Sequence, residues 1–181
     1  MTLLAAQTFD TGFPIRLSLQ VALIAVLIVT PIGLALAWIQ AKKHYRGRSL
    51  VDAFILLPLV LPPSVIGYFL VVLCGKRGPV GQFLASVFDV RLIFTPAGAV
   101  LASGVVALPL LVKTVQPALE AVPRDLERVG RSLGLGPIAL FFRVSLPSAW
   151  PGVVAGLVLA FARAVGEFGA TLMFAGNIPG R

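Results

Sequence analysis

Two opposite charges lie within an otherwise apolar stretch near the end of the chain. Arg163 and Glu167 are four positions apart in AFARAVGEFGATLMF, residues 160–174. Positions with this spacing share one face of an α-helix, so the two side chains can form an ion pair. A charge within an apolar helix is costly and usually faces protein or water. Both residues are therefore candidates for a pathway that carries a charged solute, and a structural ion pair is the favoured alternative.

A proline-rich stretch offers different chemistry. LPLVLPPSVIGY, residues 57–68, contains Pro58, Pro62 and Pro63. Proline lacks a backbone donor and clashes with the preceding turn, so a straight helix is not expected here. Within a membrane, a broken helix is tolerated where it is buried in protein or lines a cavity. The segment is either a pathway element or a packing kink, and its candidate pathway residues are Pro62, Pro63, Ser64 and Tyr68.

The composition indicates what surrounds these residues. Of 181 residues, 58% are hydrophobic and 12% are charged, and the mean hydropathy is +0.98. A soluble domain has about 25% charged residues, so membrane lipid is the expected solvent. The net charge of +8 does not indicate a partner nucleic acid, because the basic residues lie in short segments between apolar runs rather than in one patch. Such segments suit the anionic face of a membrane.

Catalytic and metal-binding chemistry has little support in the sequence. Cys74 is the single cysteine, which excludes an intramolecular disulfide and a cysteine cage, and it follows an apolar run as a small buried side chain would. His44, the single histidine, lies among basic residues without partner ligands. No catalytic set of serine, histidine and aspartate is indicated, and the phosphate loop that ends in Gly-Lys-Ser or Gly-Lys-Thr is absent. We expect no enzymatic activity, no metal and no cofactor.

Four apolar runs are long enough to cross a bilayer as helices, which takes about 20 residues each. They cover residues 15–40, 51–74, 93–113 and 152–174. The predicted fold class is all-α, a single polytopic helical membrane domain over residues 1–181. The first and third connections carry nine basic residues, whereas the outer candidates carry four, namely Arg16, Lys76, Arg77 and Arg91. This excess predicts that the two connections are cytoplasmic and that the N-terminus is outside.

The third connection has its own helical pattern. Apolar residues recur at helical spacing over 115–134, with charged residues on the other faces, which predicts a helix against a membrane or a partner protein. Gly134 and Pro137 predict the end of that helix. A second short helix is expected over 138–144, and Pro147 redirects the chain towards the fourth run. The sequence therefore predicts a helix, glycine turn, helix unit on the cytoplasmic side.

This unit resembles the cytoplasmic coupling segment of permeases in ATP-binding cassette importers. In that family a Glu-Ala-Ala motif is followed after three residues by glycine and after nine more by Ile-x-Leu-Pro. Here Gly134 is followed after nine residues by VSLP, residues 144–147. Arg128, Val129 and Gly130 stand in the place of Glu-Ala-Ala, with Glu127 one position earlier. The segment departs from the family at its front half and matches it at the glycine turn.

The resemblance implies how residues of the segment at 115–147 are used. A separate ATP-binding subunit would drive transport through this segment. The coupling residues implied are Glu127, Gly134, Leu135, Val144, Leu146 and Pro147. The apolar anchors against the ATP-binding subunit would be Leu126, Leu133, Leu135 and Phe141, with packing beneath the bundle as the alternative role.

Three stretches narrow the resemblance to the molybdate branch of the molybdate and sulfate permease group. They are residues 57–81, the coupling segment, and residues 160–180. The FARAxGE pattern is shared with sulfate and thiosulfate permeases, whereas the double proline followed by GY and the basic turn GKRG favour molybdate. The implied partners are a second copy in a homodimer, ATP-binding subunits, and a periplasmic or extracellular molybdate-binding protein, at the bacterial inner membrane. Hydroxyl donors to the oxyanion would be Ser64, Tyr68, Ser103 and Thr171.

Several alternatives stay open. Members of this branch continue past NIPG, residues 177–180, into another span, so a fifth span is expected to be missing and the chain could be a non-functional truncated fragment or a scaffold. A sulfate, thiosulfate or tungstate permease keeps the class and changes the ligand. A channel or ion-coupled transporter would need no ATPase, and the coupling segment argues against it. In the outer loop, Lys76 and Arg77 would attract the anion, contact the binding protein, or be solvated.

Overall fold

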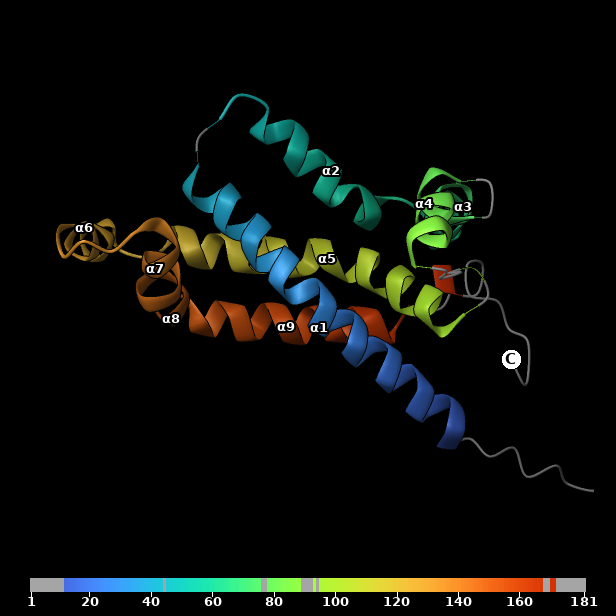
Figure 1. Ribbon diagram of the computed structural model, residues 1–181. Coiled ribbons are helices and arrows are strands. Elements are labelled where there is room, and N and C mark those ends of the chain that lie inside the picture. Colours follow the sequence, from blue (N-terminus) through green and yellow to red (C-terminus); the bar gives the residue numbers. More distant parts are fainter. Residues whose placement is uncertain are drawn as a thin grey trace, which may run out of the picture.

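The structure, a computed structural model, describes residues 12–43, 45–75, 78–88, 93, 95–167 and 170–171. Every regular element among these residues is helical, which agrees with the all-α prediction. Three helices lie side by side and form a bundle (Figure 1): α1 (Gly12–Lys42), α5 (Pro96–Glu120) and α9 (Trp150–Val165). The C-terminal ends of α1 and α5 and the N-terminal end of α9 lie at the same end of the bundle (Figure 1). α1 and α5 therefore run in the same direction and α9 in the opposite one, which is the order of a multi-pass protein with one further crossing between α1 and α5.

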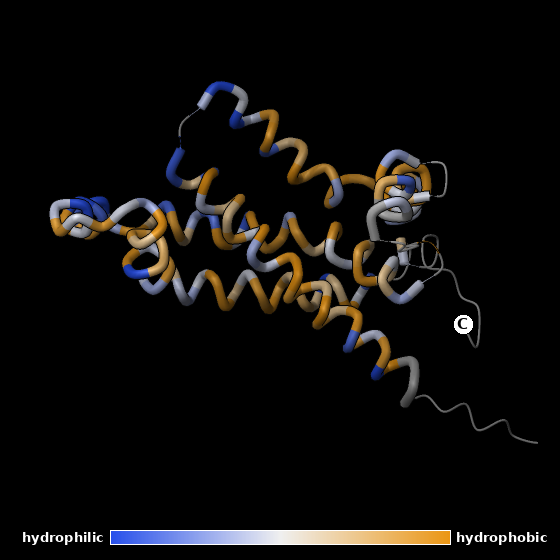
Figure 2. Tube along the Cα trace, viewed as in Figure 1, coloured by the Kyte–Doolittle hydropathy of each residue, from blue (hydrophilic) through white to orange (hydrophobic). Residues whose placement is uncertain are grey.

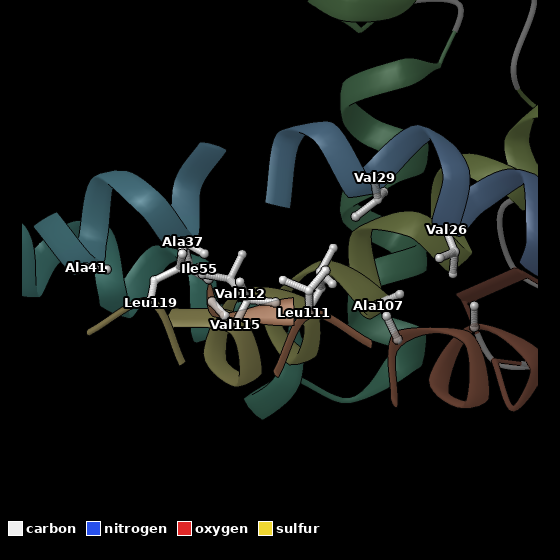
Figure 3. Packing of buried hydrophobic residues seen from close by; sticks show 14 of the residues in the cluster. Val26, Val29, Ala37, Ala41, Ile55, Ala107, Leu111, Val112, Val115 and Leu119 are labelled. Atoms are coloured by element: carbon white, nitrogen blue, oxygen red, sulfur yellow. The ribbon is translucent and has the colours of Figure 1, made fainter. Parts of the chain in front are cut away.

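Small residues allow the three bundle helices to approach closely. At Gly33 of α1, a Cβ atom would lie 2.5 Å from Cδ2 of Leu111, and at Gly152 of α9 it would lie 2.2 Å from the Cβ of Ala118. Small residues have this role in membrane helix packing, where tight van der Waals contact replaces the hydrophobic driving force. Figure 3 shows the resulting core, in which α1 and α5 contribute Val26, Val29, Ala37, Ala41, Ala107, Leu111, Val112, Val115 and Leu119.

The predicted second run is a broken helix. α2 (Arg48–Val60) ends before the proline pair and α3 (Pro63–Cys74) begins at its second member, with an angle of 113° between the two helices. Pro63 occupies the first turn of α3, where its missing N–H has no helical partner to lose. The prediction that this run is not a straight helix is confirmed. Cys74 is buried, as expected of a small apolar side chain.

One helix was not predicted. Residues 75–92 were expected to form an outer loop, but α4 (Pro79–Phe88) lies within them. Ten residues of helix extend only about 15 Å, so a search for spans could not find it. Pro79 begins the helix, and Gln82 N–H donates to the carbonyl oxygen of Gly78 at 2.9 Å. Lys76, Arg77, Arg91 and His44 lie outside the described residues, so the predictions made for them are not addressed.

Two other predicted boundaries shift. The third run was expected to end at 113, yet α5 continues to Glu120, because a charged residue ends an apolar run without ending a helix. The fourth run was expected over 152–174, whereas α9 covers Trp150–Val165 and residues 172–174 lie outside the described part of the chain. Both shifts concern the ends of helices, where polar residues begin.

Length and hydropathy agree with a membrane protein. Within the described residues, α1 from Ile15 and the whole of α5 are long and apolar enough to cross a bilayer. Two pairs of helices are long and apolar enough only when each bent pair is taken together. These are α2 with α3, and Pro137–Ser148 with α9, which are bent by 80°. The described residues therefore contain two spans, or up to four if each bent pair is one span. Figure 2 shows the apolar residues concentrated along these helices and the hydrophilic residues gathered at one end of the bundle. The assignment of four spans remains a prediction.

Candidate functional site

The segment after α5 forms a compact helical hairpin at one end of the bundle (Figure 1). It consists of α6 (Arg124–Ser132), α7 (Pro137–Leu140), the π-helical turn η1 (Phe141–Ser145) and α8 (Leu146–Ser148). The prediction of one helix over 115–134 is wrong, because residues 115–120 belong to α5 and the chain breaks at residues 121–123 before Arg124. Pro123 at that break has no N–H to continue the helical hydrogen bonds. The predicted second short helix is present over residues 137–148.

A glycine turn closes the hairpin, as predicted. Gly134 has φ of 82°, a left-handed conformation that side chains with a Cβ rarely adopt. The N–H of Gly134 donates to the carbonyl oxygen of Arg131 at 2.9 Å, and that of Leu135 donates to Gly130 at 3.1 Å. At Gly130 a Cβ atom would lie 2.6 Å from Cδ1 of Leu140. α6 and α7 are therefore held together by a tight turn and a close backbone approach.

Glu127 faces the protein's own interior. Its residue exposure is 7%, and its Oε1 lies 2.8 Å from Nζ of Lys42 at the end of α1. Ser145 Oγ donates to the same oxygen at 3.0 Å. Glu127 was expected to couple directly to an ATP-binding subunit, but these contacts occupy its carboxylate within the chain. The sequence could not show this, because Lys42 is 85 positions away.

Part of the exposed surface of the hairpin is apolar, beside the charged residues of α6. Leu126 is 48% exposed and Leu133 is 76% exposed, as the proposed anchors must be. Leu135, Val144 and Leu146 are half-buried, while Gly134 and Pro147 are exposed. Further exposed apolar residues were missed in the sequence, namely Val129, Ile138 and Phe142. Together with Leu126 and Leu133 they form what we call the apolar docking face.

Phe141 takes the alternative role left open for the four anchor candidates, which is packing against the bundle. Its side chain is buried, and its ring centroid lies 5.3 Å from that of Trp38 in α1. The π-helical turn places Phe141 inwards and the next aromatic residue, Phe142, outwards with 60% exposure. The π-turn begins at Phe141 and shifts the faces of the residues that follow it.

A second polar cluster joins α2 to the bundle at the same end. Lys113 Nζ lies 2.6 Å from Oδ1 of Asp52, and Gln40 Nε2 donates to that oxygen at 2.8 Å. Arg48 and Glu120 form an exposed ion pair at 2.8 Å, and Glu120 also accepts from Gln116 at 3.1 Å. The cluster balances its charges internally. Both ion pairs join α2 to α5 through residues that are far apart in the chain, so no local pattern in the sequence indicated them.

Arg163 near the end of α9 and Glu167 just beyond it form a mutual ion pair, one of the two structural pairings, mutual or between subunits, that were favoured from the sequence. Arg163 Nη1 lies 2.7 Å from Oε2 of Glu167, whose residue exposure is 8%. The other oxygen of Glu167 accepts from the backbone N–H of Ala170 at 2.8 Å. Thr171 Oγ1 donates to the carbonyl oxygen of Glu167 at 3.3 Å, so this hydroxyl also has an internal partner. The pair fixes the local backbone and leaves neither charge unpaired.

The remaining pathway candidates lie on the broken helix. Pro62, Pro63 and Ser64 are exposed, and Tyr68 is 61% exposed. α3 contacts the chain beyond Glu167, because Ile66 and Leu70 share an apolar cluster with Ala170 and with α5 residues. The candidates on α3 and the ion pair of α9 are therefore at the same end of the molecule. Ser103 is buried within α5, whereas the candidates on and next to α3 are exposed.

A shallow groove lies elsewhere, between the N-terminal half of α1 and α9. Its volume is about 570 Å³, and its lining residues are Ile15, Arg16, Leu19, Gln20, Leu23 and Phe161. None of the pathway candidates lines this groove. The groove therefore adds no support to the predicted pathway.

Comparison with known proteins matches this arrangement. Residues 29–180 match the family described as binding-protein-dependent transport system inner membrane component. The molybdenum transport system permease protein ModB of Escherichia coli is 46% identical over 166 residues, which are 92% of this chain and 72% of that protein. The putative molybdenum transport system permease protein YvgM of Bacillus subtilis is 40% identical over 98% of this chain and 77% of its own length.

A sulfate transporter subunit is also similar. The sulfate transport system permease protein CysT of Salmonella typhimurium is 38% identical over 90% of this chain and 58% of its own length. The family match covers both the helical hairpin and the charged part of α9. The chain therefore belongs to the binding-protein-dependent transport system inner membrane components, as a multi-pass protein of all-α fold.

Proposed function

We propose that this chain is the permease subunit of an ATP-driven importer that carries molybdate across the inner membrane. It would act as a homodimer with two ATP-binding subunits and a separate molybdate-binding protein. The observation that carries this proposal is the helical hairpin, whose glycine turn and apolar docking face project from one end of the bundle. The 46% identity to a molybdenum permease, against 38% to a sulfate permease, favours molybdate.

The docking face explains why ATP can act from another subunit. Its exposed apolar residues need a protein or lipid surface to cover them, and the chain itself contains no phosphate loop. An ATP-binding subunit that contacts this face differently in two states would shift the permease between inward-facing and outward-facing forms. Only such differential contact can move the equilibrium between them.

The basic residues support a cytoplasmic position for the hairpin and an outer N-terminus. Lys42, Arg48 and Lys113 lie at the same end as α6, together with the basic residues of the hairpin. Basic segments favour the cytoplasmic side of a membrane. The broken helix α2–α3 would then face the opposite side with α3, where a binding protein delivers its anion.

Weak, uncharged donors suit an oxyanion that must also be released. The hydroxyls of Ser64 and Tyr68 are exposed on α3, next to the proline break. Arg163 is neutralised by Glu167 and so would hold the backbone near the pathway instead of binding the anion tightly. Pro62 and Pro63 would keep this part of α3 turned away from α2.

ATP hydrolysis in proteoliposomes tests the proposal. The chain is reconstituted with its ATP-binding subunit and its binding protein, and hydrolysis is compared with molybdate, tungstate, sulfate or no anion. Stimulation by molybdate is expected. Stimulation by sulfate alone would mean that the transported anion is sulfate. The absence of stimulation by any of the anions would refute the importer proposal.

A further inference from the structure

The helical hairpin needs a contact with the bundle in addition to its covalent connections to α5 and α9. The helical hydrogen bonds stop at the break over residues 121–123, so α6 is not a rigid continuation of α5. α6 is also strongly polar on its outer side, and its buried residues are Glu127 and Gly130. Gly130 packs within the hairpin, which leaves Glu127 as the buried side chain that reaches another part of the molecule.

Glu127 connects three elements through one oxygen atom. Lys42 Nζ from α1 and Ser145 Oγ from η1 lie 2.8 Å and 3.0 Å from Glu127 Oε1. The side chains of Lys42 and Glu127 are 19% and 9% exposed, so water screens this pair weakly. Lys42 is also the last residue of α1, where a positive charge is favoured by the helix dipole.

An apolar contact lies beside this ion pair and joins the same elements. The Trp38 ring of α1 packs against Phe141 of η1 at 5.3 Å between centroids. Ala41 belongs to the same apolar cluster as Phe141 and Leu119. The end of α1 therefore meets the hairpin through one polar and one apolar contact, and a movement of the hairpin must either carry α1 with it or break both.

We propose that Lys42 is a positioning residue for energy coupling, which fastens the hairpin to α1 through Glu127. A displacement that the ATP-binding subunit imposes on the hairpin then reaches α1 directly, as well as α5 and α9 through the chain. This inference rests on the proposed function, because it assumes that an ATP-binding subunit moves the hairpin. Lys42 itself contacts neither ATP nor the transported anion.

The chain contains a matched control for this contact. Arg48 and Glu120 are also a cation and a carboxylate 2.8 Å apart at the same end of the molecule. Their side chains are 30% and 41% exposed, and they join α2 to α5 without involving the hairpin. An exposed pair contributes little to structure, whereas removal of one partner from a buried pair leaves an unpaired charge.

The decisive readout is the number of molybdate ions transported for each ATP hydrolysed by the full complex in proteoliposomes. This ratio does not change when a variant merely lowers the amount of folded protein. Lys42→Met and Glu127→Gln are expected to lower it at least about fivefold, the scale of ordinary coupling between sites. Lys42→Arg should keep the ratio, and Arg48→Met should also keep it.

A charge exchange separates positioning from simple loss of structure. Lys42→Glu alone should lower the ratio as Lys42→Met does, and the double variant Lys42→Glu with Glu127→Lys should recover most of it. An unchanged ratio in Lys42→Met and Lys42→Glu would overturn the proposal. An equal loss in Arg48→Met would overturn it too, since the effect would then not depend on the hairpin.

Hydrogen exchange distinguishes failure of the positioning role of Lys42 from failure of the proposed function. In the purified chain, Glu127→Gln should speed amide exchange over residues 124–145, and Glu120→Gln should not. If wild type shows no ATP-driven molybdate transport, the proposed function fails and the coupling role of Lys42 fails with it, even where exchange reveals the contact. If wild type transports molybdate but Glu127→Gln changes neither exchange nor the ratio, only the positioning role fails.

Discussion

The three-helix bundle and the broken pair α2–α3 are held in opposite ways. α5 buries thirteen of its residues, among them Leu111, Val112 and Val115, whereas Ile55 is the one residue of α2 that is buried. Phe54 and Val60 of α2 are 74% and 80% exposed. α5 has the packing of the fixed centre of a frame, and α2 has the packing of an element that meets lipid or another chain on most of its surface.

The difference follows from residue size and from proline. Glycines at the bundle contacts let helices touch along their backbones, and the apolar side chains fill the remaining space (Figure 3). In α2–α3, large apolar residues face outwards, and the prolines at 62 and 63 divide the run at 113°. α2 is instead fastened to α5 by polar contacts at its first turns, namely those of Asp52 and Arg48.

The largest expected effect concerns the α5–α9 contact. Gly152→Leu should destabilise the fold by about 3 kcal/mol, because its Cβ would lie 2.2 Å from that of Ala118 and the two helices would have to separate. Thermal unfolding in detergent measures this. The matched change in the other region, Ala53→Leu on an exposed position of α2, should alter stability by less than about 0.5 kcal/mol. Equal losses of stability in the two variants would show that α2 is packed as tightly as the α5–α9 contact.

The next effect concerns the ion pair of α9. Glu167→Gln should cost about 2 kcal/mol, since Arg163 is only partly exposed and would lose its carboxylate partner. Chemical denaturation of the purified chain gives the value. Glu167→Gln with Arg163→Met should be less destabilising than Glu167→Gln alone. If the double variant is instead the worse one, the two charges do not act as a pair.

A smaller effect is expected where α2 is fastened to α5. Lys113→Met should cost about 1 kcal/mol, because the pair with Asp52 is partly exposed and Gln40 still donates to that carboxylate. Hydrogen exchange should rise over residues 48–56 of α2 and stay unchanged in α9. A rise of similar size in α9 would mean that α2 belongs to the frame.

The smallest effect on stability is expected at the proline break. Replacement of Pro62 and Pro63 by alanine should change stability by less than about 0.5 kcal/mol, because both are exposed. The bend between α2 and α3 should decrease, because the backbone N–H groups that proline lacks could again donate helical hydrogen bonds. Distances between spin labels on the two helices, in a chain whose Cys74 is replaced by serine, measure the change. An unchanged distance would show that packing rather than proline sets the bend.

The sequence predicted the local features and missed the long-range ones. Gly134 and the proline pair act on their immediate neighbours, so the turn of the hairpin and the break of the second run were both predicted. The ion pair of Arg163 and Glu167 could be predicted for the same reason, because the two residues are four positions apart. The partner of Glu127 was not, because Lys42 comes near it only when the bundle has formed.

Two further misses have local physical causes. α4, with ten residues, is too short to be found in a search for membrane spans. The outward position of Phe142 follows a π-helical turn that begins at Phe141 and shifts the residues after it relative to an α-helix. Both features require knowledge of backbone geometry that residue types do not specify.

The most direct test of the account is molybdate uptake into proteoliposomes that contain the chain, its ATP-binding subunit and internal ATP, with the molybdate-binding protein outside. An ATP-driven importer should accumulate molybdate above its external concentration, and this accumulation should stop when ATP or the binding protein is omitted. Uptake at the same rate without ATP, ending when the two concentrations are equal, would show a passive channel and contradict the account.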